Sequence, residues 1–112
     1  MGIMMRVAGL LGLALLVSAI GAEAQTLDKG AALFTAQKCS LCHALDGKGN
    51  AKGALDAIGS KLKADEIRQW LVTPVEMAAK TKAERKPAMK SFASLPKEDL
   101  DALVAFLATK KK

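Results

Sequence analysis

The sequence predicts a small all-α domain with long loops and no significant sheet. Three observations favour this class. Apolar residues recur at the three- and four-residue spacing of a helix face, no stretch alternates apolar and polar residues as a strand would, and glycine- or lysine-rich stretches separate the helical segments. The length of 112 residues fits a single domain, and the aromatic content of 4% leaves few large side chains to fill a core.

The first helix is expected to begin near Thr26 or Asp28, whose side-chain oxygens can cap free N–H groups, and to run to about Lys38. Its narrow apolar stripe consists of Leu27, Ala31 and Phe34. Gly30 lies beside this stripe, although glycine inside a helix costs about 1 kcal/mol relative to alanine. We therefore expect another helix to approach closely at Gly30.

Three more helices are expected, at Ala64–Val72, at Pro74–Lys80 and from about Pro96 onward. Proline disfavours a helical residue before it, so the first of these ends before Pro74. Thr73 and Glu76 predict a capping box at the start of the next helix. The last helix begins with acidic residues and ends with lysines, as the helix dipole favours. Its apolar face consists of Leu100, Leu103, Val104 and Leu107. Residues 46–59 and 81–94 are expected to be loops.

Residues 1–24 have the pattern of a secretory signal peptide. Arg6 precedes the apolar run Val7–Ile20, and Ala22-Glu23-Ala24 fits an A-x-A cleavage site. A bilayer span needs about 20 apolar residues, which is more than this run contains. We expect cleavage after Ala24, which leaves a periplasmic domain of residues 25–112 without a membrane span. An uncleaved N-terminal anchor is the alternative.

Both cysteines and the single histidine lie in the segment Cys39-Ser40-Leu41-Cys42-His43. Three kinds of site compete for it. A C-x-x-C redox pair, which export would let oxidise to a disulfide, is typical of a βαβ setting, whereas this segment follows a helix. A closed zinc site needs four ligands, and no further Cys or His exists.

The third kind of site, C-x-x-C-H, is the pattern of c-type haem attachment. The Cys39 and Cys42 thiols can add to the two vinyl groups of one haem c, and His43 then lies next to the iron. The motif favours this interpretation, and a covalently held haem would also supply the apolar core that the composition lacks.

With this motif, the chain resembles the small monohaem class I cytochromes c of bacteria. Gly30 and Phe34 resemble the glycine and the aromatic residue of that family's first helix. Leu95–Ala108 resembles its C-terminal helix, and Lys86–Phe92, with the sequence KPAMKSF, resembles the segment that supplies a methionine ligand. The resemblance covers Leu27–Leu107 and implies a cytochrome c-like fold, with three to five helices around a covalently attached haem.

The resemblance has further implications for single residues. The first and last helices of the family cross closely, so Gly30 would face Phe106 or Val104. Many members have a Gly-Pro pair whose backbone carbonyl accepts the N–H of the proximal histidine. Here the corresponding stretch is Gly53-Ala54-Leu55, which still offers the carbonyl but fixes the loop less firmly.

Two methionines, Met77 and Met89, remain outside the predicted signal peptide as candidates for the second axial ligand. Met77 lies in a predicted helix, at a spacing where an apolar side chain packs in the core. Met89 lies in a polar, lysine-rich loop after Pro87, and enough chain separates it from His43 to reach the other face of a haem. We therefore predict His43 and Met89 as axial iron ligands, a pair that raises the reduction potential.

The implied function is one-electron transfer between redox proteins by a monomeric carrier that is not an enzyme. The net charge of +6 favours acidic partners, and export argues against nucleic acid. Five lysines flank the ligand segments and are candidates to steer such partners: Lys38, Lys80, Lys82, Lys86 and Lys90. Trp70, and also Lys61 and Arg68, are candidates to contact the haem propionates, although each can equally serve the core or the solvated surface.

Two other functions stay open. The chain can be the haem subunit of a larger redox enzyme. It can also be a haem enzyme or gas sensor whose methionine ligand is labile, although no distal His or Arg pairing suggests peroxide activation.

Overall fold

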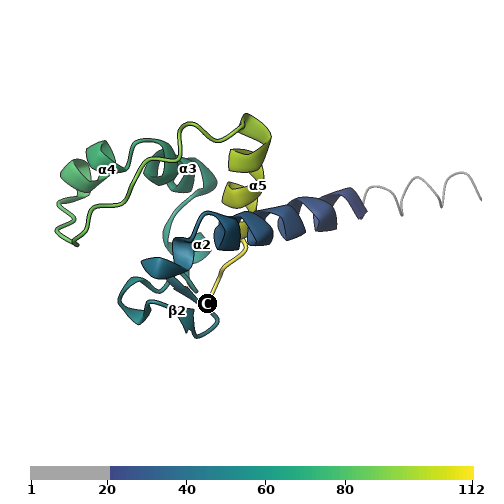
Figure 1. Cartoon of the computed structure of the whole chain (residues 1–112), viewed down its shortest axis with the longest axis horizontal. Coiled ribbons are helices and arrows are strands. Elements are labelled where there is room, and N and C mark those ends of the chain that lie inside the picture. Colours follow the sequence, from purple (N-terminus) through teal and green to yellow (C-terminus); the bar gives the residue numbers. More distant parts are fainter. Residues whose placement is uncertain (1–20) are drawn as a thin grey trace, which may run out of the picture.

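The computed structural model describes residues 21–112 and is mostly helical (Figure 1). An N-terminal helix spans residues 21–36. The elements after it are η1 (Cys39–Leu41), β1 (Ala44–Leu45), β2 (Lys48–Gly49), η2 (Ala51–Gly53), α2 (Ile58–Lys61), α3 (Ala64–Val72), α4 (Pro74–Thr81) and α5 (Lys97–Ala108). The predicted all-α class is therefore confirmed. Within residues 21–112, none of the helices combines the length and apolarity that crossing a bilayer requires.

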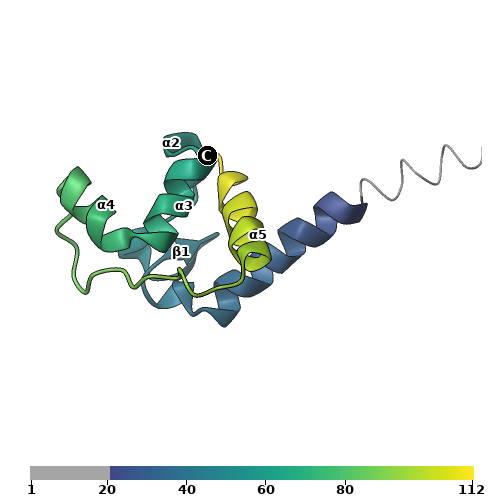
Figure 2. The same ribbon diagram turned by 90° about the horizontal axis from the view of Figure 1, so that it is seen from above.

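The start of the first helix was predicted wrongly. Thr26 and Asp28 lie inside the helix, and the Thr26 hydroxyl donates to the carbonyl of Ala22 (3.0 Å) instead of capping a helix end. The helix continues through these residues because residues 21–24 supply backbone carbonyls one turn earlier. Figures 1 and 2 show the first turns of this helix projecting away from the other helices. The predicted cleavage site after Ala24 lies within it, and residues 1–20 of the predicted signal peptide lie outside the described residues.

The helices α3, α4 and α5 agree with their predicted positions to within one residue, whereas α2 begins inside the predicted loop 46–59 and was not predicted. The predicted capping box does not form. The Thr73 hydroxyl donates to the Gln69 carbonyl (3.1 Å), so it serves the end of α3 and makes no cap for α4. Thr73 is the C-cap residue of α3 and the N-cap residue of α4, and its single hydroxyl bonds to α3. A side chain instead caps the start of α3, where the backbone N–H of Lys63 donates to the Glu66 carboxylate (3.1 Å).

The predicted loop between residues 46 and 59 contains a hairpin that the sequence prediction missed. β1 and β2 pair antiparallel through two residues each, and Asp46 and Gly47 form the connecting turn with φ values of 52° and 80°. Positive φ at both central residues is the geometry that an Asp-Gly pair favours in tight hairpins. The Asp46 N–H also donates to the Asp56 carboxylate (2.7 Å), which ties the turn to the following loop.

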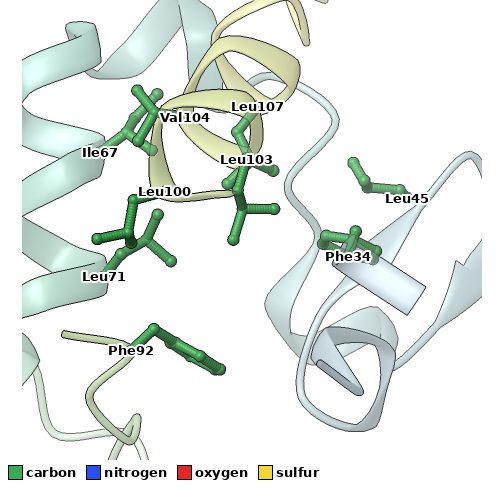
Figure 3. Close-up of a cluster of buried hydrophobic side chains, with 9 residues drawn as sticks. All are labelled: Phe34, Leu45, Ile67, Leu71, Phe92, Leu100, Leu103, Val104 and Leu107. Carbon is green, nitrogen blue, oxygen red and sulfur yellow. The ribbon is translucent and has the colours of Figure 1, made fainter. Parts of the chain in front are cut away.

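The core forms around α5 (Figure 3). Leu103 is completely buried at its centre, and α3 packs on one side through Ile67 and Leu71. The N-terminal helix contributes Phe34, whose ring centre lies 6.2 Å from that of Phe106.

Gly30 lies where the N-terminal helix crosses α5. A Cβ at this position would overlap the backbone oxygen of Ala102 and the Cβ of Phe106. The close approach at Gly30 is thus confirmed, and its nearest neighbours are Ala102 and Phe106.

The long connection between α4 and α5, residues 82–96, runs back beside α3. The backbone N–H of Phe92 donates to the Leu71 carbonyl (2.7 Å), and the Ser91 hydroxyl donates to the Val72 carbonyl (2.8 Å). In Figures 1 and 2 this segment is the extended green trace that leads from α4 toward α5. Because Phe92 is buried, the end of the loop is anchored in the core.

Candidate functional site

A cavity of about 580 Å³ lies beside the core, and most of its lining is apolar. Its walls come from the Cys39–His43 segment, from α2, α3 and α4, from loop 82–96 and from α5. The apolar lining includes Leu55, Ile58, Leu62, Ile67, Leu71, Phe92 and Leu107. This volume falls within the range of small-molecule and cofactor sites, roughly 300–1,000 Å³. The predicted site residues Cys39, Cys42, His43 and Met89 all line this one cavity.

Local backbone structure turns the cysteine segment toward the cavity. Lys38 adopts a left-handed conformation with φ of 58°, and there the chain leaves the N-terminal helix and enters the turn η1. The backbone N–H of His43 donates to the Cys39 carbonyl (2.9 Å), which holds the segment in a compact turn. Both thiols are free and half-buried. Burial raises the pKa of the Cys39 thiol, so it is protonated at neutral pH.

The imidazole of His43 is oriented by a single backbone oxygen. Its Nδ1 lies 2.9 Å from the carbonyl oxygen of Gly53. A carbonyl can only accept, so Nδ1 carries the proton and Nε2 keeps a free lone pair. Burial lowers the pKa of His43 below its ordinary value, and the positive charge of Arg85 acts in the same direction, against the effect of the hydrogen bond. The ring is therefore neutral at pH 7, the state in which imidazole binds a metal.

Gly53 can lie close to His43 because it has no side chain. A Cβ on Gly53 would overlap the carbonyl oxygen of Cys42 and a guanidinium nitrogen of Arg85, and it would lie 2.9 Å from His43 Nδ1. The carbonyl expected in the Gly53-Ala54-Leu55 stretch thus does contact the histidine. A backbone partner of this kind orients the ring of a metal-binding histidine.

The two methionines occupy different environments. Met77 is buried on α4 and does not line the cavity, as its predicted packing role requires. Met89 is half-buried in loop 82–96, packs against the core and lines the cavity. Its thioether is the soft donor that this loop contributes.

The charged groups along the cavity are all basic. They are Lys38, Arg85, Lys86 and Lys90, while Lys80 and Lys82 lie outside the lining. Of the three candidates for propionate contacts, Trp70 lines the cavity, whereas Lys61 and Arg68 do not. Arg68 is instead paired with Asp101 on α5. Arg85 was missed in the sequence analysis, because no pattern in the chain marks its approach to Gly53.

These residues fit a covalently attached haem. The cavity offers an apolar wall for a flat macrocycle, two thiols two residues apart for its vinyl groups, and a neutral imidazole with a free lone pair. Among residues 21–112, no three or more His, Cys, Asp or Glu side chains gather as a metal-binding group. The two thiols and the imidazole of the cavity therefore suit a haem site better than a closed zinc site, which needs four ligands.

Comparisons with known proteins agree with this arrangement. A family model described as cytochrome c matches residues 27–111, which is most of the chain. Searches of curated proteins and of solved structures gave no significant match.

Proposed function

The chain belongs to the cytochrome c family, and on that premise we propose that it is an exported one-electron carrier with one covalently attached haem c. Cys39 and Cys42 would form the thioether bonds, and His43 and Met89 would hold the iron. Membership of the family implies haem-based electron transfer. The ligands, the export and the role as a carrier are our proposals for this chain.

One observation carries the proposal: both thiols, His43 and Met89 line the same apolar cavity. When bound there, haem would supply one-electron exchange between Fe(III) and Fe(II). The Gly53 carbonyl keeps His43 Nδ1 protonated and Nε2 free to donate to a metal. The hydrogen bond from Phe92 to Leu71 ties the loop that carries Met89 to α3, so this thioether is held by the fold as well.

This arrangement favours a carrier over a haem enzyme or gas sensor. If His43 and Met89 both donate, neither face of the iron is open to a substrate. The lining is mostly apolar, and ligands that the backbone holds in place would have little to rearrange when an electron arrives. A reduced protein that resists carbon monoxide would agree with this role.

Absorption spectroscopy of the haem-loaded protein and of two methionine variants tests the ligands. A pyridine haemochrome spectrum reports the two thioether bonds. We expect the oxidised wild-type protein to show the weak near-infrared band of a thioether–iron bond and Met89→Ala to lose it. Met77→Leu is the matched control, because it replaces the buried methionine at similar volume and should keep the band. A band that persists in Met89→Ala would exclude Met89 as ligand.

The basic cavity surroundings suggest acidic redox partners. Lys38, Lys86 and Lys90 line the cavity and are exposed, which places positive charge around the site where an electron would leave. Electron transfer to an acidic partner should therefore slow as ionic strength rises. Charge reversal at Lys86 and Lys90 should lower the rate and its salt dependence, whereas rates that ignore salt would contradict steering.

Export is proposed from the N-terminal pattern alone. Sequencing the N-terminus of the protein recovered from periplasm is the test, and Gln25 is the expected first residue.

A further inference from the structure

The proposed cleavage would make Gln25 the first residue of the exported domain. In the described structure Gln25 lies inside the helix of residues 21–36, and its side chain is exposed. Residues 22–26 are all exposed, and Figures 1 and 2 show this part of the helix projecting away from the other helices. The new end of the chain would therefore be open to solvent, and the fold would not cover its α-amine.

A free α-amine at this position would place a positive charge at the unfavourable end of a helix. Cleavage removes the Ala22 carbonyl, which accepts the Thr26 hydroxyl (3.0 Å), and it leaves the N–H groups of a new first turn without helical partners. An α-amine is mostly protonated at pH 7, and the helix dipole disfavours a cation at the N-terminus. Asp28 is the one charged side chain among residues 25–28, and its sign is the one that the dipole favours.

Glutamine at the start of a chain has a reaction that removes this charge. The neutral α-amine attacks the carboxamide carbon of its own side chain. A new C–N bond closes a lactam ring, the bond to the amide nitrogen breaks, and that nitrogen leaves as ammonia with a proton from the amine. No oxidant, reductant or further reactant is consumed. The product, pyroglutamate, is neutral, and its ring contains the backbone nitrogen, as in proline, which is favoured at the first position of a helix.

We propose that Gln25 of the exported protein is converted to pyroglutamate. The inference rests on the proposed cleavage after Ala24, and it adds a modification site that the role of electron carrier does not require. The lactam removes the cation from the helix end, just before the residues that attach this helix to α5. There Lys29 pairs with Asp99 (2.9 Å), and Gly30 contacts the α5 backbone. The lactam also denies an exposed chain end to aminopeptidases that need a free α-amine.

The test compares the wild-type protein with Gln25→Asn, each recovered from the periplasm with its haem and analysed at once. Asparagine keeps an exposed carboxamide, but it is shorter by a methylene group, so its amine cannot close the same ring. Mass spectrometry gives the mass of the intact protein and the identity of its N-terminal peptide. A second sample is treated with pyroglutamyl peptidase, which removes an N-terminal pyroglutamate and no other residue, and its N-terminus is then sequenced.

For the wild type we expect the mass of residues 25–112 with haem, less one ammonia, and Thr26 as the first residue after the peptidase. Gln25→Asn should keep its ammonia and should not respond to the peptidase. The same loss of ammonia in Gln25→Asn would place it elsewhere in the chain and overturn the inference.

A wild-type chain that begins with a free Gln25 overturns the inference and leaves the proposed cleavage standing, even if the residue cyclises later during storage. A chain that begins at another residue overturns both the cleavage and the modification. Failure of the proposed carrier function looks different, because the protein would then lack the pyridine haemochrome spectrum of covalent haem, whatever its N-terminus.

Discussion

At the scale of single residues, the orientation of His43 depends on one atom, the carbonyl oxygen of Gly53. The contact is close because Gly53 has no Cβ, which would otherwise overlap the Cys42 carbonyl and the Arg85 guanidinium. We predict that Gly53→Ala forces the loop away from His43 and lowers the free energy of unfolding by about 1–3 kcal/mol, the usual effect of overpacking. The yield of protein with covalent haem should fall as well. Thermal unfolding and haem content by pyridine haemochrome measure the two effects.

Gly47→Asn is the matched control for this substitution. Gly47 has open space around it, and its φ of 80° is a conformation that asparagine tolerates. It should therefore leave stability and haem content close to those of the wild type. If Gly53→Ala behaved like this control, the Gly53 carbonyl would not be what orients His43.

At the scale of elements, the crossing of the N-terminal helix with α5 requires glycine at position 30. Alanine is the better helix former by about 1 kcal/mol, so propensity alone predicts that Gly30→Ala stabilises the protein. We predict the opposite, a net destabilisation of about 1–2 kcal/mol, because the new Cβ overlaps the backbone of Ala102. A lower Tm is the expected readout. The control is Ala32→Gly, at an exposed position of the same helix, which measures the difference in helix propensity between alanine and glycine alone. A Tm raised by Gly30→Ala would contradict the close crossing.

Ion pairs of Asp101 connect α3 to α5 and make stability depend on pH. The carboxylate accepts from Lys97 (2.9 Å) and from Arg68, and these two contacts hold the pKa of Asp101 below its ordinary value of 3.8. Because the pKa of Asp101 is lower in the folded protein than in the unfolded chain, the ion pairs stabilise the fold fully at a pH above the pKa of the unfolded chain. This stabilisation is lost as the pH falls through the pKa of the folded protein.

We therefore predict that Asp101→Asn is less stable than the wild type at pH 5–7 and that the difference shrinks as pH falls below about 3.8. The Asp101 side chain is 40% exposed, so solvent screens its ion pairs and the difference should be small. Chemical denaturation across this pH range measures it. The control is Asp28→Asn, which removes an exposed carboxylate of the N-terminal helix that makes no ion pair among residues 21–112. A difference between Asp101→Asn and the wild type that is constant with pH would exclude the ion pairs as its cause.

The elements that the sequence predicted well are those with a helical period and a terminating signal. Ala64–Val72 was predicted at its observed bounds, because the apolar face of Ile67 and Leu71 is followed by Pro74. The β1–β2 hairpin was missed, since two-residue strands have no measurable alternation, although its Asp46-Gly47 turn was a usable signal. The Thr73 cap failed for a reason that sequence does not show, because α3 and α4 compete for its hydroxyl.

Within the site, too, some residues could be predicted from the sequence and others could not. Cys39, Cys42 and His43 are adjacent, so the motif alone predicted that they share one site, and all three line the cavity. Met89 was chosen from its polar loop and from the resemblance to a family, since loops carry no period, and it lines the same cavity. Arg85 could not have been found, because its contact with Gly53 depends on how loop 82–96 folds back beside the proximal segment.

At the scale of the whole molecule, the protein core is small and the cavity is large. Leu103 is the one large side chain in residues 21–112 that is fully buried, whereas the cavity measures about 580 Å³. Apolar side chains that line so large an open space lack packing partners on one side, which weakens the packing of the elements that carry them. The packing of α3, α4 and loop 82–96 around it should therefore depend on the haem.

We predict that Cys39→Ala/Cys42→Ala, which cannot attach haem, loses cooperative thermal unfolding. Its near-UV circular dichroism should be weak, and part of the helical far-UV signal should remain, because helices form more readily than their packing. The haem-loaded wild type should unfold in one sharp transition. Met89→Ala is the control that distinguishes loss of the haem from loss of one proposed iron ligand. It keeps both thiols, so it should still unfold cooperatively, at a lower Tm. A sharp transition at the wild-type Tm in the double cysteine variant would show that the helices pack without the haem.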